Sequence, residues 1–226
     1  MNEKLKPFLA RAKECYEIKE LERLGLSPDL DQRNLILTFL SLILKWNPAA
    51  GLVSPKDEEN LFVRHFCDSI QPLLLFGFKK DARILDIGTG AGFPSIPIRI
   101  FRPDLIFSLL ECNRKKASFL REAITELNFE NITVLNKRTE QIKGTGEKFD
   151  YVLCRGIGSL SKIAQMAKPF VATDGRIYTF KTRQFEKELA EITKNKAKDG
   201  ICISEIAEYD LGNQIMGLNL VSLSLL

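Results

Sequence analysis

The chain has 226 residues, enough for one medium-sized domain with an appendage, and its composition (45% hydrophobic, 27% charged) is ordinary for a soluble globular protein. A net charge of +4 is compatible with a nucleic-acid partner but does not by itself argue for one. The five scattered cysteines form no C-x-x-C pair and there is one histidine, which argues against a disulfide framework and against a metal centre. We therefore expect reduced thiols and a cytoplasmic protein.

Residues 1 to about 80 read as helical throughout. Apolar residues recur at helical spacing over 5–16, and a more apolar helix is expected over 30–46, ended by Asn47 and Pro48. A third helix is expected to start near Glu58 and to carry His65. The longest apolar stretch is too short to span a bilayer, so no membrane partner is expected. We predict a helical cap over residues 1–80.

From about residue 81 the pattern changes to strands that alternate with amphipathic segments. The candidate strands are 82–87, 105–111, 132–135, 149–154, 176–181, 200–208 and 217–225, and the amphipathic segments are 114–128, 160–171 and 184–198. This alternation predicts an α/β domain over residues 81–226, with a mostly parallel sheet covered by helices on both faces. Gly212 and Asn213 predict a hairpin between the last two strands, at the sheet edge.

A glycine-rich loop follows the first strand as Asp86-x-Gly88-x-Gly90-x-Gly92. Glycine lacks a Cβ and adopts positive φ, so such a strand–loop–helix junction lets a cofactor approach the bare backbone. The dinucleotide pattern G-x-G-x-x-G would need glycine at position 93, where Phe93 stands, which argues strongly against a nicotinamide-dependent oxidoreductase. The motif resembles the first motif of the Rossmann-like S-adenosylmethionine (SAM) methyltransferases.

The ends of the later strands carry further polar residues, where a doubly wound sheet binds its ligands. Glu111 follows the second strand, 23 positions after Gly88, and could accept hydrogen bonds from both hydroxyls of an adenosine ribose. The loop 136–140 could lie against the adenine or be a solvated turn. Arg155 could hold a carboxylate or a phosphate, and Lys181 could supply a second cation; each could also be merely solvated.

Further segments resemble the RsmG (GidB) family, bacterial methyltransferases that modify N7 of a guanine in small-subunit (16S) ribosomal RNA. The residues that carry the resemblance are Asn60-Leu61-x-x-Arg64-His65-x-x-Asp68-Ser69, the run from Leu85 to Pro97, Arg102-Pro103-Asp104, Arg114-Lys115-Lys116, Phe119 to Glu122, Arg138-Thr139-Glu140, Phe149-Asp150, Arg155, Gly175-Arg176 and Lys181. Family members usually have leucine at Phe93, glycine at Ser95 and aspartate at Glu111. They also continue into a basic tail, so we expect RNA affinity here to lack that contribution or to come from elsewhere.

The resemblance implies SAM as the cofactor and a Rossmann-like sheet with an N-terminal helical extension. The cofactor-binding residues that we expect are Asp86, Gly88, Gly90, Gly92, Phe93, Glu111, Thr139, Glu140 and Arg155. The residues that we expect to contact RNA are Arg64, His65, Arg138, Arg155 and Lys181, although His65 alone reads as a structural histidine. The partner is expected to be 16S ribosomal RNA or the small ribosomal subunit, and the protein a monomer without metal.

No acid–base catalytic residue is expected, because guanine N7 carries no proton and a proximity mechanism is sufficient. Two other functions remain open at this point. One is a SAM-dependent methyltransferase of a small molecule or a protein, and the other is a SAM- or RNA-binding module without turnover.

Overall fold

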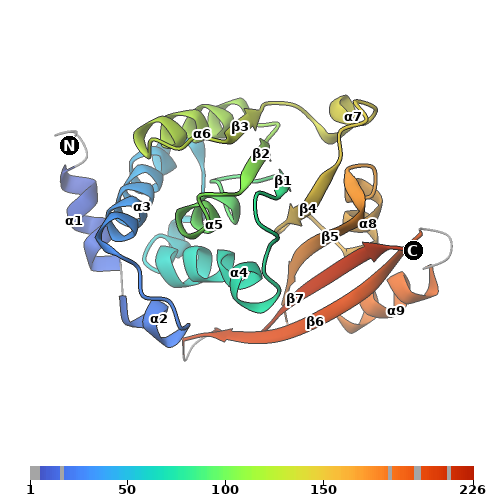
Figure 1. The fold of residues 1–226 in the computed structure, drawn as a ribbon. Coiled ribbons are helices and arrows are strands. Elements are labelled where there is room, and N and C mark those ends of the chain that lie inside the picture. Colours follow the sequence, from blue (N-terminus) through green and yellow to red (C-terminus); the bar gives the residue numbers. More distant parts are fainter. Residues whose placement is uncertain (1–5, 16–17, 183–184, 196–199, 213–214) are drawn as a thin grey trace.

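A computed structural model describes residues 6–15, 18–182, 185–195, 200–212 and 215–226 (Figure 1). The elements before the sheet are α1 (Lys6–Cys15), α2 (Ile18–Arg23), α3 (Leu30–Ala50), the 3-10 helix η2 (Pro55–Asp57), the π-helix η3 (Phe62–Cys67) and α4 (Gln71–Leu75). The α/β part contains β1 (Arg83–Ile87), α5 (Ser95–Phe101), β2 (Ile106–Leu110), α6 (Arg114–Glu126), β3 (Ile132–Leu135), α7 (Thr139–Ile142), β4 (Phe149–Cys154), α8 (Leu160–Ala167), β5 (Val171–Lys181), α9 (Glu186–Lys194), β6 (Ile201–Leu211) and β7 (Ile215–Leu225). None of the helices described is long and apolar enough to cross a membrane.

The strands form one seven-stranded sheet in the order β3-β2-β1-β4-β5-β7-β6. Strands β1 to β5 pair in parallel, whereas β7 is antiparallel to both β5 and β6. The predicted α/β class and the antiparallel hairpin at the sheet edge are confirmed; Asn213 itself lies outside the described residues. The strand order reverses between β1 and β4, and in open α/β sheets ligands bind at such a switch point, outside the carboxyl ends of the strands.

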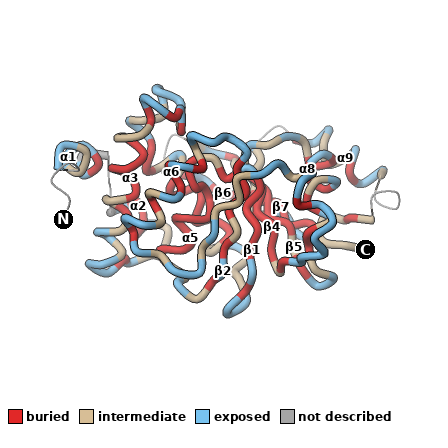
Figure 2. Tube along the Cα trace, turned by 90° about the horizontal axis from the view of Figure 1, so that it is seen from above, coloured by how far each residue is buried: buried red, intermediate tan, exposed pale blue. Residues whose placement is uncertain are grey.

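Two hydrophobic cores lie on opposite faces of the sheet, because successive side chains of a strand point to opposite sides. Ile84 of β1 packs into the core that α3, η3, α5 and α6 share, whereas Leu85 packs into the core that α8 and α9 cover. Figure 2 shows the buried strands between these two helical layers. The N-terminal helices thus pack directly on one face of the sheet, and the division of the chain at residue 80 stays a prediction.

The second helix runs further than its sequence predicts. We expected Asn47 and Pro48 to end it, but α3 continues through Pro48 to Ala50 and ends at Gly51, which has φ +58°. The side chain of Asn47 donates to Glu58 and accepts from the backbone of Val53, which stabilises the last turn. A proline one turn from the end removes a single intrahelical hydrogen bond, and these contacts compensate for it.

The helix that we predicted to start near Glu58 and to carry His65 is present, but most of it is a π-helix. Residues Phe62–Cys67 form a π-helix and only Gln71–Leu75 form a short α-helix. The π-helix carries Arg64 and His65, and Asp68 follows it directly. Wide helical turns of this kind occur frequently at functional sites.

Candidate active site

The glycine loop lies at the carboxyl end of β1, where Gly88, Gly90 and Gly92 all have positive φ (71°, 60° and 87°). A Cβ on Gly92 would lie 2.5 Å from Cδ1 of the buried Ile96, so helix α5 could not pack as closely on the loop. A Cβ on Gly88 would lie 3.0 Å from a methyl group of Ile157. Glycine at these positions therefore allows both the backbone conformation and the close packing of the loop.

Asp86 lies directly before the loop and is completely buried. Its Oδ2 accepts hydrogen bonds from the hydroxyls of Thr89 and Ser95, both at 2.7 Å. Burial raises the pKa of Asp86 to about 7, and these two hydrogen bonds oppose the rise. Ser95, which stands where the resembled family usually has glycine, thus adds a hydrogen bond beneath the loop.

Glu111 connects three of the segments that surround the site. Its Oε2 accepts from the N–H of Gly90 at 3.0 Å, and its Oε1 accepts from the N–H of Asn113 at 2.7 Å. The side chain of Asn136 donates to the carbonyl of Glu111 at 2.8 Å. Glu111 is only 7% exposed, so it is an ordered part of the site and not a freely solvated loop residue.

A cavity of about 360 Å³ opens beside Gly88 and Glu111. It is lined by Ile87, Gly88, Leu110, Glu111, Cys112, Lys137, Arg138, Thr139, Glu140, Ile157, Lys162 and Met166. Apolar side chains at the ends of β1 and β2, in the loop after β4 and in α8 line it together with a carboxylate that can accept from ribose hydroxyls. The size and lining fit the adenosine half of SAM.

The cavity contains only some of the expected cofactor residues. Gly88, Glu111, Thr139 and Glu140 line it, together with Arg138, which we expected to contact RNA instead. The others, Asp86, Gly90, Gly92, Phe93 and Arg155, are not part of this lining: they form the loop and its support, or belong to a neighbouring cluster of side chains. The cavity therefore corresponds to one half of the expected cofactor site.

Arg155 follows β4 at the switch point and is held by the segment around η3. Its Nε donates to Oδ2 of Asp68 at 2.7 Å, its Nη2 donates to the carbonyl of Arg64 at 2.8 Å, and its Nη1 lies 3.2 Å from Nδ1 of His65. The guanidinium carbon lies 5.8 Å from the ring centroids of both Phe93 and Phe180. Arg155 is thus a largely ordered cation, with its side chain 18% exposed.

His65 and Phe93 stack on each other with ring centroids 5.3 Å apart, and both are buried or nearly so. Burial, followed by the charge of Arg155, lowers the pKa of His65 to about 4, so the ring is neutral at physiological pH. His65 therefore offers no cation to an RNA phosphate. Phe93 also packs against Phe39 of α3, at 5.4 Å, as part of the core.

The remaining expected RNA contacts differ in how they are presented. Arg138 is exposed at the start of α7, and Arg64 has a side chain 53% exposed that pairs with Asp57 at 2.8 Å. Lys181 corrects our expectation: its ammonium donates to the carbonyl of Gly158 at 2.6 Å and pairs with Glu188 at 2.7 Å, and its side chain is 8% exposed. It does not present a free cation at the rim.

Sequence reasoning missed Lys162, Ile157 and Met166 on the α8 side of the cavity, and Tyr209 in the cluster around Arg155. Two glycines with positive φ, Gly156 and Gly158, follow β4 and could have indicated a second close-packed loop. Tyr209 gave no such signal, because it lies in β6, 141 positions from the Asp68 that it contacts.

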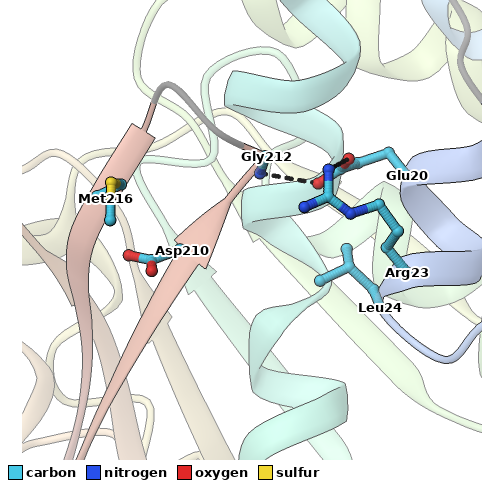
Figure 3. Close-up of a pocket in the computed structure, with 6 residues that line it drawn as sticks. All are labelled: Glu20, Arg23, Leu24, Asp210, Gly212 and Met216. Carbon is cyan, nitrogen blue, oxygen red and sulfur yellow. Dashed lines mark hydrogen bonds and ion pairs between the residues drawn. The ribbon is translucent and has the colours of Figure 1, made fainter.

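A second cavity lies between α2 and the β6–β7 hairpin (Figure 3). It measures about 340 Å³, and none of the expected site residues lines it. Glu20 accepts from the N–H of Gly212 at 2.9 Å and pairs with Arg23 at 3.3 Å, so the side chains at this place connect the two ends of the chain. Among the residues that the structure describes, no group of three or more His, Cys, Asp or Glu side chains is placed to hold a metal ion.

The sheet order, the glycine loop and the Glu111 cavity define a SAM-dependent methyltransferase of the Rossmann-like class. Solved structures with this fold include a ribosomal protein L11 methylase from Lactobacillus delbrueckii subsp. bulgaricus, with a TM-score of 0.54 at 12% identity, covering 70% of this chain and 76% of that one. Aeropyrum pernix fibrillarin with natively bound S-adenosyl-L-methionine gives a TM-score of 0.52 at 15% identity, covering 71% and 75%. At such identities the likeness concerns the fold.

The sequence comparisons identify the family. The model of the GidB family, rRNA small subunit methyltransferase G, matches residues 32–215. Proteins with the name ribosomal RNA small subunit methyltransferase G are 35% identical in Lactococcus lactis subsp. cremoris (77% of this chain, 75% of the relative) and 31% identical in Clostridium beijerinckii (90% and 86%). The chain belongs to the rRNA small subunit methyltransferase G family.

Proposed function

We propose that the protein transfers a methyl group from SAM to N7 of a guanine in 16S ribosomal RNA. The observation that carries this proposal is the Glu111 cavity beside the glycine loop at the β1–β4 switch point, in a chain of the rRNA small subunit methyltransferase G family. Glu111 holds the loop and accepts from the ribose, and Thr139 and Glu140 border the adenine. Arg155 holds the carboxylate of the methionine part.

SAM supplies an electrophilic methyl group on a sulfonium sulfur, and guanine N7 supplies an in-plane lone pair without a proton. The methyl–sulfur bond breaks as the methyl–N7 bond forms, which leaves a neutral thioether and a cationic base. No side chain has to remove a proton, so the protein acts by placing the two reactants in line. Two side chains near the site that could act as a base already have partners. Asp68 accepts from Arg155 and Tyr209, and Nδ1 of His65 lies against Arg155. These contacts support a mechanism without a general base.

The direct test is methyl transfer from labelled SAM to small ribosomal subunits and to free 16S RNA, both from cells that lack the modification. We expect 7-methylguanosine at one position of the RNA, identified by mass spectrometry of nuclease fragments. Label in a metabolite or in a protein instead would indicate one of the other methyltransferase functions. SAM binding without any transfer would indicate a binding module, and either result would overturn the proposal.

We further propose that Arg64 and Arg138 contact the RNA backbone. Contacts between arginine and phosphate release counterions, so the affinity for RNA should fall steeply as the salt concentration rises. We expect Arg64→Gln and Arg138→Gln each to weaken RNA binding and to lower this salt dependence. Arg83→Gln is the matched control, because Arg83 is 47% exposed and paired with Glu147 at the amino end of β1. Unchanged salt dependence in both variants would exclude these contacts.

The assembly state and location follow as parts of the same proposal. We propose that the protein acts as a monomer in the cytoplasm, where it meets ribosomal RNA or the small subunit. Light scattering at the concentrations used in the methylation assay tests the first point, and a stable dimer would contradict it. Fractionation of cell extracts, followed with an antibody, tests the second.

A further inference from the structure

Asp68 joins three parts of the molecule through its two carboxylate oxygens. Oδ2 accepts from Nε of Arg155 at 2.7 Å, and Oδ1 accepts from the hydroxyl of Tyr209 at 2.5 Å. Asp68 follows η3, Arg155 follows β4, and Tyr209 lies in β6, so the carboxylate connects the η3 segment to the switch point and to the edge strand β6. The side chain of Asp68 is 10% exposed and Tyr209 is buried, so water does not compete for these bonds.

The guanidinium of Arg155 has five N–H donors, and three of them are engaged by η3 and the residue after it: one each by Asp68, His65 and the carbonyl of Arg64. The rings of Phe93 and Phe180 restrict the group further. One N–H on Nη1 and one on Nη2 remain, and the planar geometry of the guanidinium aims these two donors in fixed directions. A carboxylate is a strong acceptor for such guanidinium N–H donors.

We infer that Asp68, supported by Tyr209, is a positioning residue that orients Arg155 to receive the methionine carboxylate of SAM. This inference rests on the proposed role of Arg155 in cofactor binding and extends it to a residue that touches no cofactor atom. Without the carboxylate of Asp68, Arg155 keeps its charge but loses the bond that sets its Nε direction. The arginine then holds the carboxylate less well, whereas the adenosine half of the site is unaffected.

Two ligands separate this role from a general effect on the fold. S-adenosylhomocysteine carries both the adenosine and the amino-acid carboxylate, whereas methylthioadenosine carries only the adenosine half. We expect Asp68→Asn to weaken binding of S-adenosylhomocysteine about tenfold, the effect of losing one charge-assisted hydrogen bond, and to leave the dissociation constant of methylthioadenosine unchanged. Tyr209→Phe should produce the same pattern with a smaller, roughly threefold effect.

The matched control is Asp104→Asn. Asp104 also pairs with an arginine, accepting from Nε and Nη2 of Arg102 at 2.8 and 2.6 Å, but it lies before β2, at the opposite end of the strands. We expect this variant to bind both ligands as the wild type does, even where its melting temperature falls. Isothermal titration calorimetry measures the dissociation constants, and thermal melts of each variant verify that it is folded.

A double-variant cycle completes the test. If Asp68 acts through Arg155, Asp68→Asn has no further effect on S-adenosylhomocysteine binding once Arg155→Gln is present. Equal weakening of both ligands, or effects of the two substitutions that simply add, would overturn the inference and leave Asp68 with a structural role only. If Arg155→Gln itself leaves S-adenosylhomocysteine binding unchanged, the cofactor role of Arg155 and this inference both fail. The proposed methyl transfer to RNA is judged separately, by 7-methylguanosine formed by the wild type.

Discussion

The carboxyl group of Asp86 is fully buried at the end of β1, and its Oδ1 has no hydrogen-bond partner in the structure. Burial raises its pKa from an ordinary value of 3.8 to about 7 despite the hydroxyls of Thr89 and Ser95. A raised pKa means that the folded state binds a proton more tightly than the unfolded state between these two values. The contribution of this group to stability is therefore fully present below pH 4 and is lost as the pH rises through 7.

We expect Asp86→Asn to remove this part of the pH dependence. Between pH 4 and pH 8, the free energy of unfolding of the wild type should fall by about 4 kcal/mol relative to that of the variant. This value follows from a pKa difference of about three units, at 1.36 kcal/mol for each unit. Urea unfolding of both proteins across this range measures the difference. A constant difference between the two proteins at every pH would show that Asp86 titrates normally in the folded state.

His65 is the single histidine of the chain, so its ring protons can be followed without assignment problems. Burial and the neighbouring charge of Arg155 lower its pKa to about 4, with Arg64 acting in the same direction and Asp57 against it. We expect Arg155→Gln to raise the pKa of His65 toward 6.5, because a positive charge beside the ring is removed. Proton NMR titration measures this, and Arg102→Gln at the far end of the strands serves as the unaffected control. A wild-type pKa near 6.5 would contradict the burial of the ring.

At the scale of the elements, the sequence predicts several of the parallel strands closely because they are short, mostly apolar runs with turn residues at their ends, although β5 begins at Val171 and not at 176 as predicted. The predicted strand 149–154 matches β4, and 82–87 differs from β1 by one residue. The helical segments were less predictable. Pro48 predicted that the helix ends there, but the helix continues to Ala50, with its last turn stabilised by the Asn47 side chain. In the segment 62–67, nothing in the composition distinguishes a π-helix from an α-helix.

The glycine loop also has one feature that the sequence predicts and one that only the structure shows. Its position at the carboxyl end of β1 follows from spacing, because Asp86-x-Gly88-x-Gly90-x-Gly92 directly follows a mostly apolar strand. The spacing does not show at which position a side chain would also clash with its neighbours, in addition to being strained by the positive φ. The structure separates the positions: a Cβ on Gly92 would meet Ile96, whereas a Cβ on Gly90 would meet only the carbonyl oxygen of Gly88, at 3.9 Å.

We therefore expect Gly92→Ala to destabilise the protein more than Gly90→Ala. Both substitutions place an L-residue at positive φ, at a cost of about 1–2 kcal/mol. Gly92→Ala adds a clash with the buried Ile96, worth roughly another 1–3 kcal/mol. The free energies of unfolding in urea give the comparison. Equal losses in the two variants would mean that Ile96 moves aside freely and that the loop does not depend on this contact.

For the molecule as a whole, contacts between distant parts of the chain complete the site. Arg155 meets residues about 90 positions earlier, Tyr209 meets Asp68 across 141 positions, and Gly212 meets Glu20 across 192. Periodicity and local motifs carry no information on such pairs, because each partner satisfies its own local pattern. The sequence therefore singles out several residues of the Glu111 cavity and also Arg155, Arg64 and His65. The way the last three cluster around Asp68 and Tyr209 follows only from the three-dimensional structure.

The contact between Glu20 and Gly212 connects the N-terminal helices to the C-terminal hairpin (Figure 3). The Glu20 side chain is 9% exposed, so removing it leaves the N–H of Gly212 without this acceptor in a poorly solvated place. We expect Glu20→Ala to lower the free energy of unfolding by about 1–2 kcal/mol, and Glu20→Gln, which keeps an acceptor oxygen, to lower it by less. Hydrogen exchange at the Gly212 amide should accelerate in Glu20→Ala while amides in β1 and β4 change only with global stability. Exchange that accelerates equally in α2, β1 and β6 would show that the helices and the hairpin unfold only together with the sheet, because local opening and global unfolding expose different amides.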